Sequence, residues 1–459
     1  MQVNDIHSQL NDTAVADVVG VDSLAAIQGA VASSELPIAV CGGRHAMGGQ
    51  QFCSGGLLLD TRPLKRVLDF DRENGVIEVE AGIQWPELLD YLREEQPDGA
   101  GPAWGIRQKQ TGADRLSIGG ALAANVHGRG LTFPPIVADV ESFTLLGPHG
   151  ELRTCSREEN TDLFRLVIGG YGLFGVVYSV RLRLMPRTKV ERVVEVRSID
   201  GIIEAFDQRI SDGFLFGDFQ FSIDPDDPEF LRRGVFSCYR PVDDATPIPD
   251  GQRALSREDW GRLLHLAHVD KTQVWDAYTT HYLATSGQVY WSDAHQLAEY
   301  LDDYHLELDR LTGATDRATE MITEIYVPRD RLDDFTAEAA ADFREHGVDV
   351  VYGTIRLIER DDETFLPWAR EPWACTIFNL HTVHTPAGLE HAGDAFRRLI
   401  DMALARGGSY FLTYHRWARP EQVDACYPRF RDFLAAKREH DPDERFQSDW
   451  YRHYAGVLA

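Results

Sequence analysis

The chain has 459 residues, enough for a large core and, by length alone, for about three domains. Hydrophobic residues make up 43% and aromatic residues 10%, as in a globular protein. The net charge of −27 repels nucleic acid and anionic membrane surfaces, so neither is an expected partner, and an anionic substrate would need a local basic patch.

Six cysteines are spread along the chain, with no C-x-x-C pair and no cluster with histidines at zinc spacing. This distribution is typical of reduced thiols in the cytosol. The first residues form no basic or apolar targeting segment, and no stretch approaches the roughly 18 apolar residues of a membrane span. We therefore expect a cytoplasmic protein with no membrane span.

The first glycine-rich loop follows an apolar run over residues 36–40 that predicts a buried strand. Glycines at 42, 43, 48 and 49 let the backbone come close to a ligand. Successive free N–H groups in such a loop suit a pyrophosphate. His45, in the middle of the loop, is placed to act on a cofactor as well as to hold it, although a sharp turn with a surface histidine gives the same pattern.

The surrounding segment predicts a helix over 23–32 and strands over 38–40, 57–60, 67–70 and 76–80, the last two joined by an Asn-Gly turn. Trp85-Pro86 opens a helix with proline in its first turn. A second hairpin is predicted over 140–155, and period-two alternation predicts a strand over 175–184. Residues 1 to about 186 therefore form an α+β unit of short elements and glycine-rich loops.

Residues 170–175 match the G-x-G-x-x-G motif of nicotinamide-binding Rossmann folds. That fold requires the motif after a strand and at the start of a helix. Here a helix predicted over 161–166, capped by Thr161 or Asp162, precedes the motif and a strand follows it. The order disfavours a Rossmann fold, although these glycines can still approach a cofactor.

A third glycine-rich segment, residues 117–130, is small and apolar at first and then polar at Asn125 and His127. Small residues let a flat ring lie against the start of a helix, and a tightly packed core helix is the alternative. Together, the segments at 41–50, 112–130 and 169–175 indicate one extended ligand of the size of a dinucleotide.

From about 187 to 408 the pattern predicts longer helices, over 292–311 and 331–345, and strands over 190–196, 321–327 and 376–380. We expect a second domain there, a sheet with flanking helices. From residue 409 a strand over 410–412 and a helix over 420–439 complete the chain.

Five segments between residues 42 and 177 carry a family resemblance: Gly42-Gly43-Arg44-His45, Val79-Glu80-Ala81-Gly82, Ser117-Ile118-Gly119-Gly120, His127-Gly128 and residues 172–177. As a set they resemble the FAD-linked oxidases of the vanillyl-alcohol oxidase superfamily, nearest the branch of alditol oxidase, aldonolactone oxidases and decaprenylphosphoryl-ribose oxidase. The resemblance implies an α+β protein with a two-part PCMH-type FAD domain (1–186), a cap domain of antiparallel sheet that binds substrate (187–408) and a C-terminal segment (409–459) that returns to the FAD domain.

The resemblance implies bound FAD, with its diphosphate on the 42–46 loop and the 112–120 segment. In covalent members the histidine after the arginine carries the flavin, and His45 stands at that position; the serine usual after it is replaced by Ala46. The expected cofactor-binding residues are Gly42, Gly43, Arg44, His45, Ala46, Gly49, Gly112, Ser117, Gly119, Gly120, Asn125, His127, Gly175 and Val177.

Catalysis in this family moves a hydride from a C–H bond next to oxygen to flavin N5, while a nearby base takes the hydroxyl proton. His415 aligns with a substrate-reaching lysine of decaprenylphosphoryl-ribose oxidase and is the expected base, with a core or surface histidine as the alternative. Arg356 matches an arginine of alditol oxidase that stabilises the reduced flavin or binds substrate; a surface salt bridge is its alternative.

Glu324 and His381 lie on predicted strands from which they can face the cavity. His381 and His384 are spaced for a shared metal only on a helix, so no metal site is expected.

The expected function is FAD-dependent removal of a hydride from a CH–OH group of a sugar, sugar-alcohol or lactone-like substrate, with O2 or another electron acceptor reoxidising the flavin. Thr354 stands where alditol oxidase has a glutamate, which argues against a simple polyol. Two alternatives remain: the flavin half of a two-enzyme keto-sugar epimerisation, and a non-catalytic binding protein.

Overall fold

The first glycine-rich loop begins where one strand of a small parallel sheet ends. The computed structural model describes residues 1–96, 103–298, 301 and 303–458. In it, strands β3 (Asp17–Gly20), β4 (Ile38–Cys41) and β5 (Leu57–Asp60) pair in the order β3-β5-β4. Helix α1 (Leu24–Ser33) covers this sheet with Ile27 and Val31, and the Ser23 side chain caps its start.

An antiparallel five-stranded sheet forms the rest of the N-terminal unit, in the order β10-β9-β11-β7-β6. Its strands are β6 (Val67–Asp71), β7 (Val76–Glu80), β9 (Val140–Leu146), β10 (Leu152–Ser156) and β11 (Val176–Arg183). The helices beside it are α2 (Trp85–Glu95), α3 (Ile118–Ala124) and α4 (Thr161–Val167). Short strands β1 (Gln2–Val3), β2 (Thr13–Ala14), β8 (Trp104–Gly105) and β12 (Met185–Pro186) form two separate pairs. Both predicted hairpins are confirmed.

The G-x-G-x-x-G segment connects α4 to β11, so it follows a helix and precedes a strand, as expected. The predicted cap of α4 is wrong. Asn160 is the residue before the helix, with a left-handed backbone (φ 47°), a conformation that Asn tolerates well. Thr161 and Asp162 therefore lie within the first turn.

The second part of the chain is built on an eight-stranded sheet with the order β16-β13-β15-β14-β18-β19-β17-β20, in which all paired strands run antiparallel. Its strands are β13 (Lys189–Ser198), β14 (Phe216–Phe221), β15 (Arg233–Val242), β16 (Val289–Trp291), β17 (Ala318–Pro328), β18 (Val350–Ile358), β19 (Trp373–Val383) and β20 (Ser409–Tyr410). The α+β architecture with an antiparallel-sheet domain is thus confirmed.

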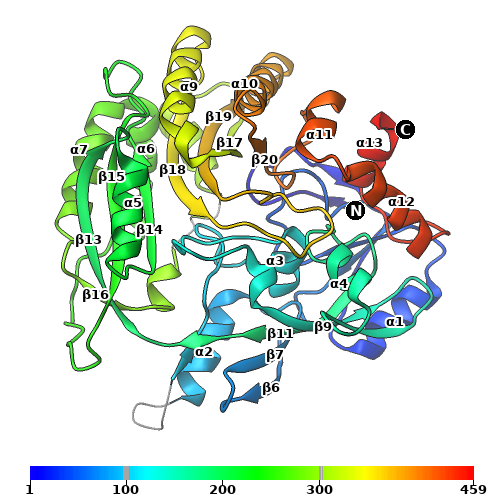
Figure 1. Ribbon diagram of the computed structural model, residues 1–459. Helices are drawn as coiled ribbons and strands as arrows, with labels where there is room; N and C mark the ends of the chain where they lie inside the picture. Colours follow the sequence, from blue (N-terminus) through cyan, green and yellow to red (C-terminus); the bar gives the residue numbers. More distant parts are fainter. Residues whose placement is uncertain (97–102, 299–300, 302, 459) are drawn as a thin grey trace.

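Helices flank this sheet (Figure 1). They are α5 (Ile202–Ser211), α6 (Arg257–Val269), α7 (Lys271–Leu283), α8 (Tyr304–Thr312), α9 (Leu332–His346) and α10 (Pro386–Leu404). Helices α9 and α10 pack against each other and against β17, whereas α6 and α7 contact β18 and β13. No helix among the described residues has both the length and the apolar character needed to cross a bilayer.

The predicted helix over 292–311 is wrong. The segment leaves β16, makes a short 3₁₀ turn (Ala294–Gln296) and becomes helical only at α8; residues 299–300 and 302 lie outside the described part. Ser292 accepts a hydrogen bond from the N–H of Thr188, and Asp293 pairs with Arg187 at 2.8 Å. These side-chain bonds compete with helix formation at this point.

The predicted helix over 420–439 is two helices, α11 (Pro420–Cys426) and α12 (Phe430–His440), because Pro428 between them has no N–H to donate. The chain then returns to its beginning. Ile38 donates to the Arg445 carbonyl at 2.6 Å, and Gln447 donates to the Ile38 carbonyl at 2.9 Å. The last helix, α13 (Asp449–Val457), begins beside the N-terminal unit, where Asp449 accepts a hydrogen bond from the Ser54 N–H at 3.0 Å.

Candidate active site

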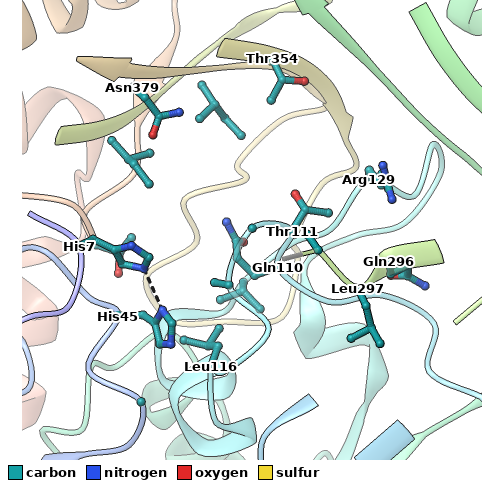
Figure 2. A pocket seen from close by; sticks show the side chains of 18 of the residues that line it. His7, His45, Gln110, Thr111, Leu116, Arg129, Gln296, Leu297, Thr354 and Asn379 are labelled. Atoms are coloured by element: carbon teal, nitrogen blue, oxygen red, sulfur yellow. Dashed lines mark hydrogen bonds between the residues drawn. The ribbon is translucent and has the colours of Figure 1, made fainter. Parts of the chain in front are cut away.

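A cavity of about 730 Å³ is shared by the N-terminal unit and the eight-stranded sheet. Figure 2 shows Thr354 and Asn379 reaching into it from the sheet, opposite His45 and Leu116 of the N-terminal unit. Of the predicted cofactor-binding residues, those on its wall are Gly42, Gly43, Arg44, His45, Ala46, Gly112, Gly119, Gly120, Gly175 and Val177. Residues that are far apart in sequence therefore contribute to one ligand space.

The 42–46 loop has the features of an anion-binding loop. Among the described residues, none of its five backbone N–H groups donates a hydrogen bond to another backbone group. Arg44 holds a left-handed conformation (φ 60°), a strained state that persists only where the surroundings demand it. A Cβ atom on Gly43 would lie 2.3 Å from the Arg115 carbonyl oxygen. These open donors and the glycine backbone fit the diphosphate of a dinucleotide.

Four predicted cofactor-binding residues, Gly49, Ser117, Asn125 and His127, lie off the wall. Ser117 caps α3 by accepting a hydrogen bond from Gly120 at 3.2 Å, and a Cβ atom on Gly42 would lie only 2.0 Å from its Oγ. Ser117 therefore holds the start of α3 in close contact with the 42–46 loop.

Asn125 ends α3 in a left-handed conformation (φ 49°). Its side chain accepts from the Val137 N–H at 3.1 Å and donates to Asp361 at 2.9 Å. Gly49 (φ 79°) turns the chain after the loop, and a Cβ atom there would lie 3.0 Å from Asn11. These residues shape the loops behind the wall.

His45 is buried and hydrogen-bonded to a second histidine. Its Nδ1 lies 2.8 Å from Nε2 of His7 (Figure 2). Its Nε2 makes no hydrogen bond of good geometry within the described part of the chain, although the Arg115 carbonyl is close enough to act on the ring. Burial, and then His7, lower the pKa of His45 well below its ordinary value. The imidazole is therefore neutral, as a nucleophile must be.

Nothing in the sequence pattern indicated His7, because it lies 38 residues before His45 and outside every motif. Burial lowers its pKa to about 4, against the opposing effect of Asp5. The histidine pair is thus uncharged near neutral pH.

On the other side of the cavity, alternate residues of neighbouring strands present polar groups. Strand periodicity puts every second side chain on one face of a sheet. The members of this face on the wall are Arg192 on β13, Asp218 and Gln220 on β14, Tyr352, Thr354 and Arg356 on β18, Asn379 on β19, and Glu320 and Glu324 on β17.

Arg356 is 5% exposed, so a surface salt bridge is excluded. Its Nε and Nη1 have no hydrogen-bond partner among the described residues. Two N–H donors of a buried cation are thus available beside the cavity.

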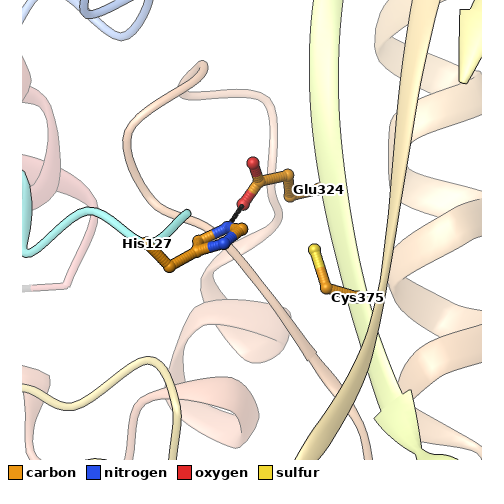
Figure 3. A group of neighbouring side chains, drawn as sticks. All are labelled: His127, Glu324 and Cys375. Carbon is orange, nitrogen blue, oxygen red and sulfur yellow. Dashed lines mark hydrogen bonds and ion pairs between the residues drawn. The ribbon is translucent and has the colours of Figure 1, made fainter. Parts of the chain in front are cut away.

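Glu324 is the centre of a buried hydrogen-bond network. It accepts from Tyr414 at 2.7 Å and from Tyr326 at 2.8 Å, and His127 Nε2 lies 3.1 Å away (Figure 3). Burial alone would raise the pKa of Glu324, but His127 and the hydroxyl donors outweigh burial and lower it. A carboxylate held by three donors is a poor proton acceptor, so Glu324 is suited to positioning its neighbours.

Two clusters contain possible metal ligands. In the first, Cys375 joins His127 and Glu324 (Figure 3). Burial raises the pKa of the Cys375 thiol well above its ordinary value, which disfavours the thiolate that a metal would need.

The second cluster joins Glu320 to His268 Nε2 at 3.2 Å and to His381 Nδ1 at 4.0 Å. Its donor set has the composition of a divalent-cation site, and the three ligand atoms lie within 4.8 Å of one another. His384 does not join it, because its Nε2 bonds Thr319 Oγ1 at 2.8 Å.

The structure places two of the predicted catalytic residues away from the wall. His415 is buried, with its ring 3.6 Å from that of Phe396 and 4.5 Å from that of Trp417. Burial lowers its pKa to about 3. The neighbouring Tyr414 is on the wall instead. His381 is likewise not on the wall and belongs to the cluster with Glu320 and His268.

Comparison with known proteins agrees with this geometry. Residues 13–156 match a family model described as "FAD binding domain". The L-gulono-1,4-lactone dehydrogenase of Mycobacterium tuberculosis is 25% identical over 88% of this chain and 87% of its own length.

Two rice (Oryza sativa subsp. japonica) proteins match the chain over shorter stretches. Mitochondrial L-galactono-1,4-lactone dehydrogenase 2 is 34% identical over 30% of this chain and 22% of its own, and cytokinin dehydrogenase 7 is 31% identical over 39% and 33%. With the loops and cavity described above, these matches show an FAD-linked oxidoreductase and support the resemblance to the PCMH-type oxidase superfamily and its aldonolactone branch.

Proposed function

We propose that the protein oxidises a CH–OH group of a sugar, sugar-alcohol or lactone-like substrate. The observation that carries the proposal is the shared cavity: the cofactor loops line one side and the polar face of the eight-stranded sheet lines the other. When bound there, FAD supplies the two-electron acceptor, which O2 or another acceptor then reoxidises. The M. tuberculosis relative, named for a sugar lactone, aligns with both parts of the chain and supports this substrate class.

Arg356 and Glu324 have different roles in this proposal. The unpartnered N–H groups of Arg356 stabilise negative charge that develops beside them during the reaction. Glu324 acts through Tyr414, whose hydroxyl it fixes at the wall. His415 and His381 have no part in it, because neither side chain reaches the cavity.

We also propose that His45 carries the flavin covalently. The neutral imidazole lies on the cavity wall, His7 occupies its Nδ1, and its Nε2 has no hydrogen bond of good geometry. Nε2 is therefore the ring atom that would form the bond.

Anaerobic mixing tests the proposed oxidation. The purified flavoprotein is mixed with a panel of sugars, sugar acids, polyols and aldonolactones. The absorbance of the oxidised flavin, at about 450 nm, is followed. Bleaching by at least one CH–OH donor is the expected result. A flavin that dithionite reduces but no member of the panel bleaches would overturn the proposal. Peroxide release on admitting O2 separates an oxidase from an enzyme with another acceptor.

A further inference from the structure

The cavity holds a group of cations that hydride transfer does not by itself require. Figure 2 shows Arg129 and Gln296 at the opposite end of the cavity from His45. Arg192 lines the same cavity from strand β13 and is 8% exposed. Burying guanidinium groups without enough counter-charge is costly, so their presence calls for an explanation.

Arg129 and Arg192 lie against one aromatic ring. Their guanidinium carbons are 5.1 Å and 5.4 Å from the centre of the Tyr239 ring. Arg192 also lies 4.5 Å from the centre of the Tyr282 ring. Contact with the same ring holds the two cations near each other, and Arg129 Nη2 also donates a hydrogen bond to the His295 carbonyl.

The two arginines have few charged partners. Arg129 approaches Asp218 Oδ2 at 3.7 Å, a long contact, and its Nε has no hydrogen-bond partner among the described residues. Arg192 donates from Nε to the Ser237 hydroxyl at 3.0 Å, and no ion pair joins it to a described carboxylate. One carboxylate therefore faces two guanidinium groups.

Several other charged groups in or next to the wall have partners, whereas Arg356 adds further N–H groups without a partner among the described residues. Glu324 accepts from two tyrosines and pairs with His127, and Glu320 pairs with His268. Lys109 pairs with Asp114 at 2.6 Å. The wall thus carries more guanidinium groups than carboxylates free to pair with them, within a chain whose net charge is −27.

Further polar atoms at this end lack partners. Both ring nitrogens of His295, the Oε1 of Gln220 and the Oδ1 of Asp218 make no hydrogen bond within the described residues. The His295 ring lies 4.3 Å from the Tyr239 ring, beside the two arginines. A ligand with both acceptor and donor groups would satisfy these atoms together.

We propose that the substrate carries an anionic oxygen group, a carboxylate or a phosphate, which Arg129 and Arg192 bind at the end of the cavity opposite His45. Planar guanidinium groups bind either anion through paired N–H donors. The anion orients the substrate, and its hydroxyl-bearing carbons lie toward the cofactor loops. This inference rests on the proposed function and names the substrate class of the same cavity: sugar acids or sugar phosphates in place of neutral sugars.

The test compares matched ligands on the holoenzyme. Gluconate is compared with glucitol and glucose 6-phosphate with glucose, because the members of each pair differ mainly in the anionic group. Each ligand is titrated anaerobically while flavin absorbance and the melting temperature are recorded. Inorganic phosphate and acetate are titrated in the same way. We expect an anionic ligand to bind at least tenfold more tightly than the neutral member of its pair. Preference for gluconate and acetate assigns a carboxylate, and preference for glucose 6-phosphate and inorganic phosphate assigns a phosphate.

Arg192→Gln removes one cation, and Arg192→Lys keeps the charge. Arg197→Gln, on the same strand but 42% exposed, is the matched control. Losing a charge-assisted contact raises the dissociation constant of the anion about ten- to a hundredfold in Arg192→Gln. Arg192→Lys restores part of the affinity, and neither variant changes the binding of glucitol or glucose.

Equal affinity for the neutral and anionic members of both pairs, or an equal loss for both members in Arg192→Gln, would overturn the inference. The melting-temperature shift decides this even where no ligand bleaches the flavin, so failure of the oxidation proposal remains distinguishable.

Discussion

Replacement of Glu324 tests the buried network most sharply. Glu324→Ala removes the acceptor of Tyr326 and Tyr414 and the partner of His127, all buried. Breaking a buried pair of this kind costs about 3–5 kcal/mol of the free energy of unfolding. Glu324→Gln keeps one acceptor oxygen and leaves at least one donor unmatched, at a cost of about 1–3 kcal/mol.

Thermal unfolding measures these costs. At about 2.1 cal/mol/K per residue, the unfolding entropy of a 459-residue chain converts each kcal/mol into a melting-temperature change of about 1 °C. Glu324→Ala should therefore melt about 3–5 °C below the unmodified protein at pH 7. The exposed Glu307→Gln, which loses only its pair with Arg310, should not change the melting temperature. A Glu324→Ala protein that melts within 1 °C of the unmodified one (about one kcal/mol on this scale) would refute the reasoning.

The pH dependence follows from the lowered pKa of Glu324. Because the folded pKa lies below the unfolded value of about 4.3, the carboxylate adds stability that is fully present above that value. The added stability is lost as the pH falls through the folded pKa. The gap between the unmodified protein and Glu324→Gln should therefore be constant from pH 6 to 8 and narrow below about pH 4.

Three further predictions concern the N-terminal unit. His7→Phe removes the hydrogen bond to His45, so attachment of flavin in reconstituted apoprotein should slow about tenfold, measured as flavin retained after denaturation; an unchanged rate would contradict the positioning role. Gly42→Ala places a Cβ atom 2.0 Å from Ser117 Oγ and should lower flavin content, read from the absorbance ratio of flavin to protein; full occupancy would show that the two loops need not meet so closely. All six cysteines are buried and unpaired, so a thiol reagent should react slowly with the native chain and with six thiols after unfolding; rapid reaction of the native protein would be inconsistent with this packing.

Alternation and turn chemistry predicted the N-terminal unit more completely than the second part, where strands β14, β15, β16 and β18 were not predicted. The strands of the N-terminal unit and its two hairpins follow from local patterns, and so does the position of the G-x-G-x-x-G segment between a helix and a strand. The local patterns also did not predict helices α5, α6, α7, α10 and α13. The burial of α7 is unlike that of a core helix. Val274 is its one fully buried residue, while Tyr278 and Tyr282 face the cavity. A helix that lines a ligand space does not show the usual apolar stripe.

The glycine-rich part of the cavity wall could be predicted from the sequence because glycine has a distinctive backbone role. The glycine-rich loops were recognisable in the sequence. The structure places glycines of these loops, including Gly42 and Gly43, on the cavity wall and close to other loops. The substrate side depends on pairs such as Arg192 with Tyr239, which only the register of distant strands brings together.

The structure places the His415 side chain away from the cavity wall. The adjacent Tyr414 faces the cavity, whereas His415 packs against Phe396 of α10. A sequence alignment places a residue along the chain but does not say which side its side chain takes.

The central claim is that FAD occupies the cavity with His45 beside it. The most direct measurement is the distribution of flavin after the purified protein is denatured and digested. We predict that flavin absorbance stays with the peptide that contains His45, and that His45→Ala binds flavin that denaturation releases. Flavin that leaves the unmodified chain completely would contradict the covalent assignment, and a protein purified without any flavin would contradict the occupancy of the cavity itself.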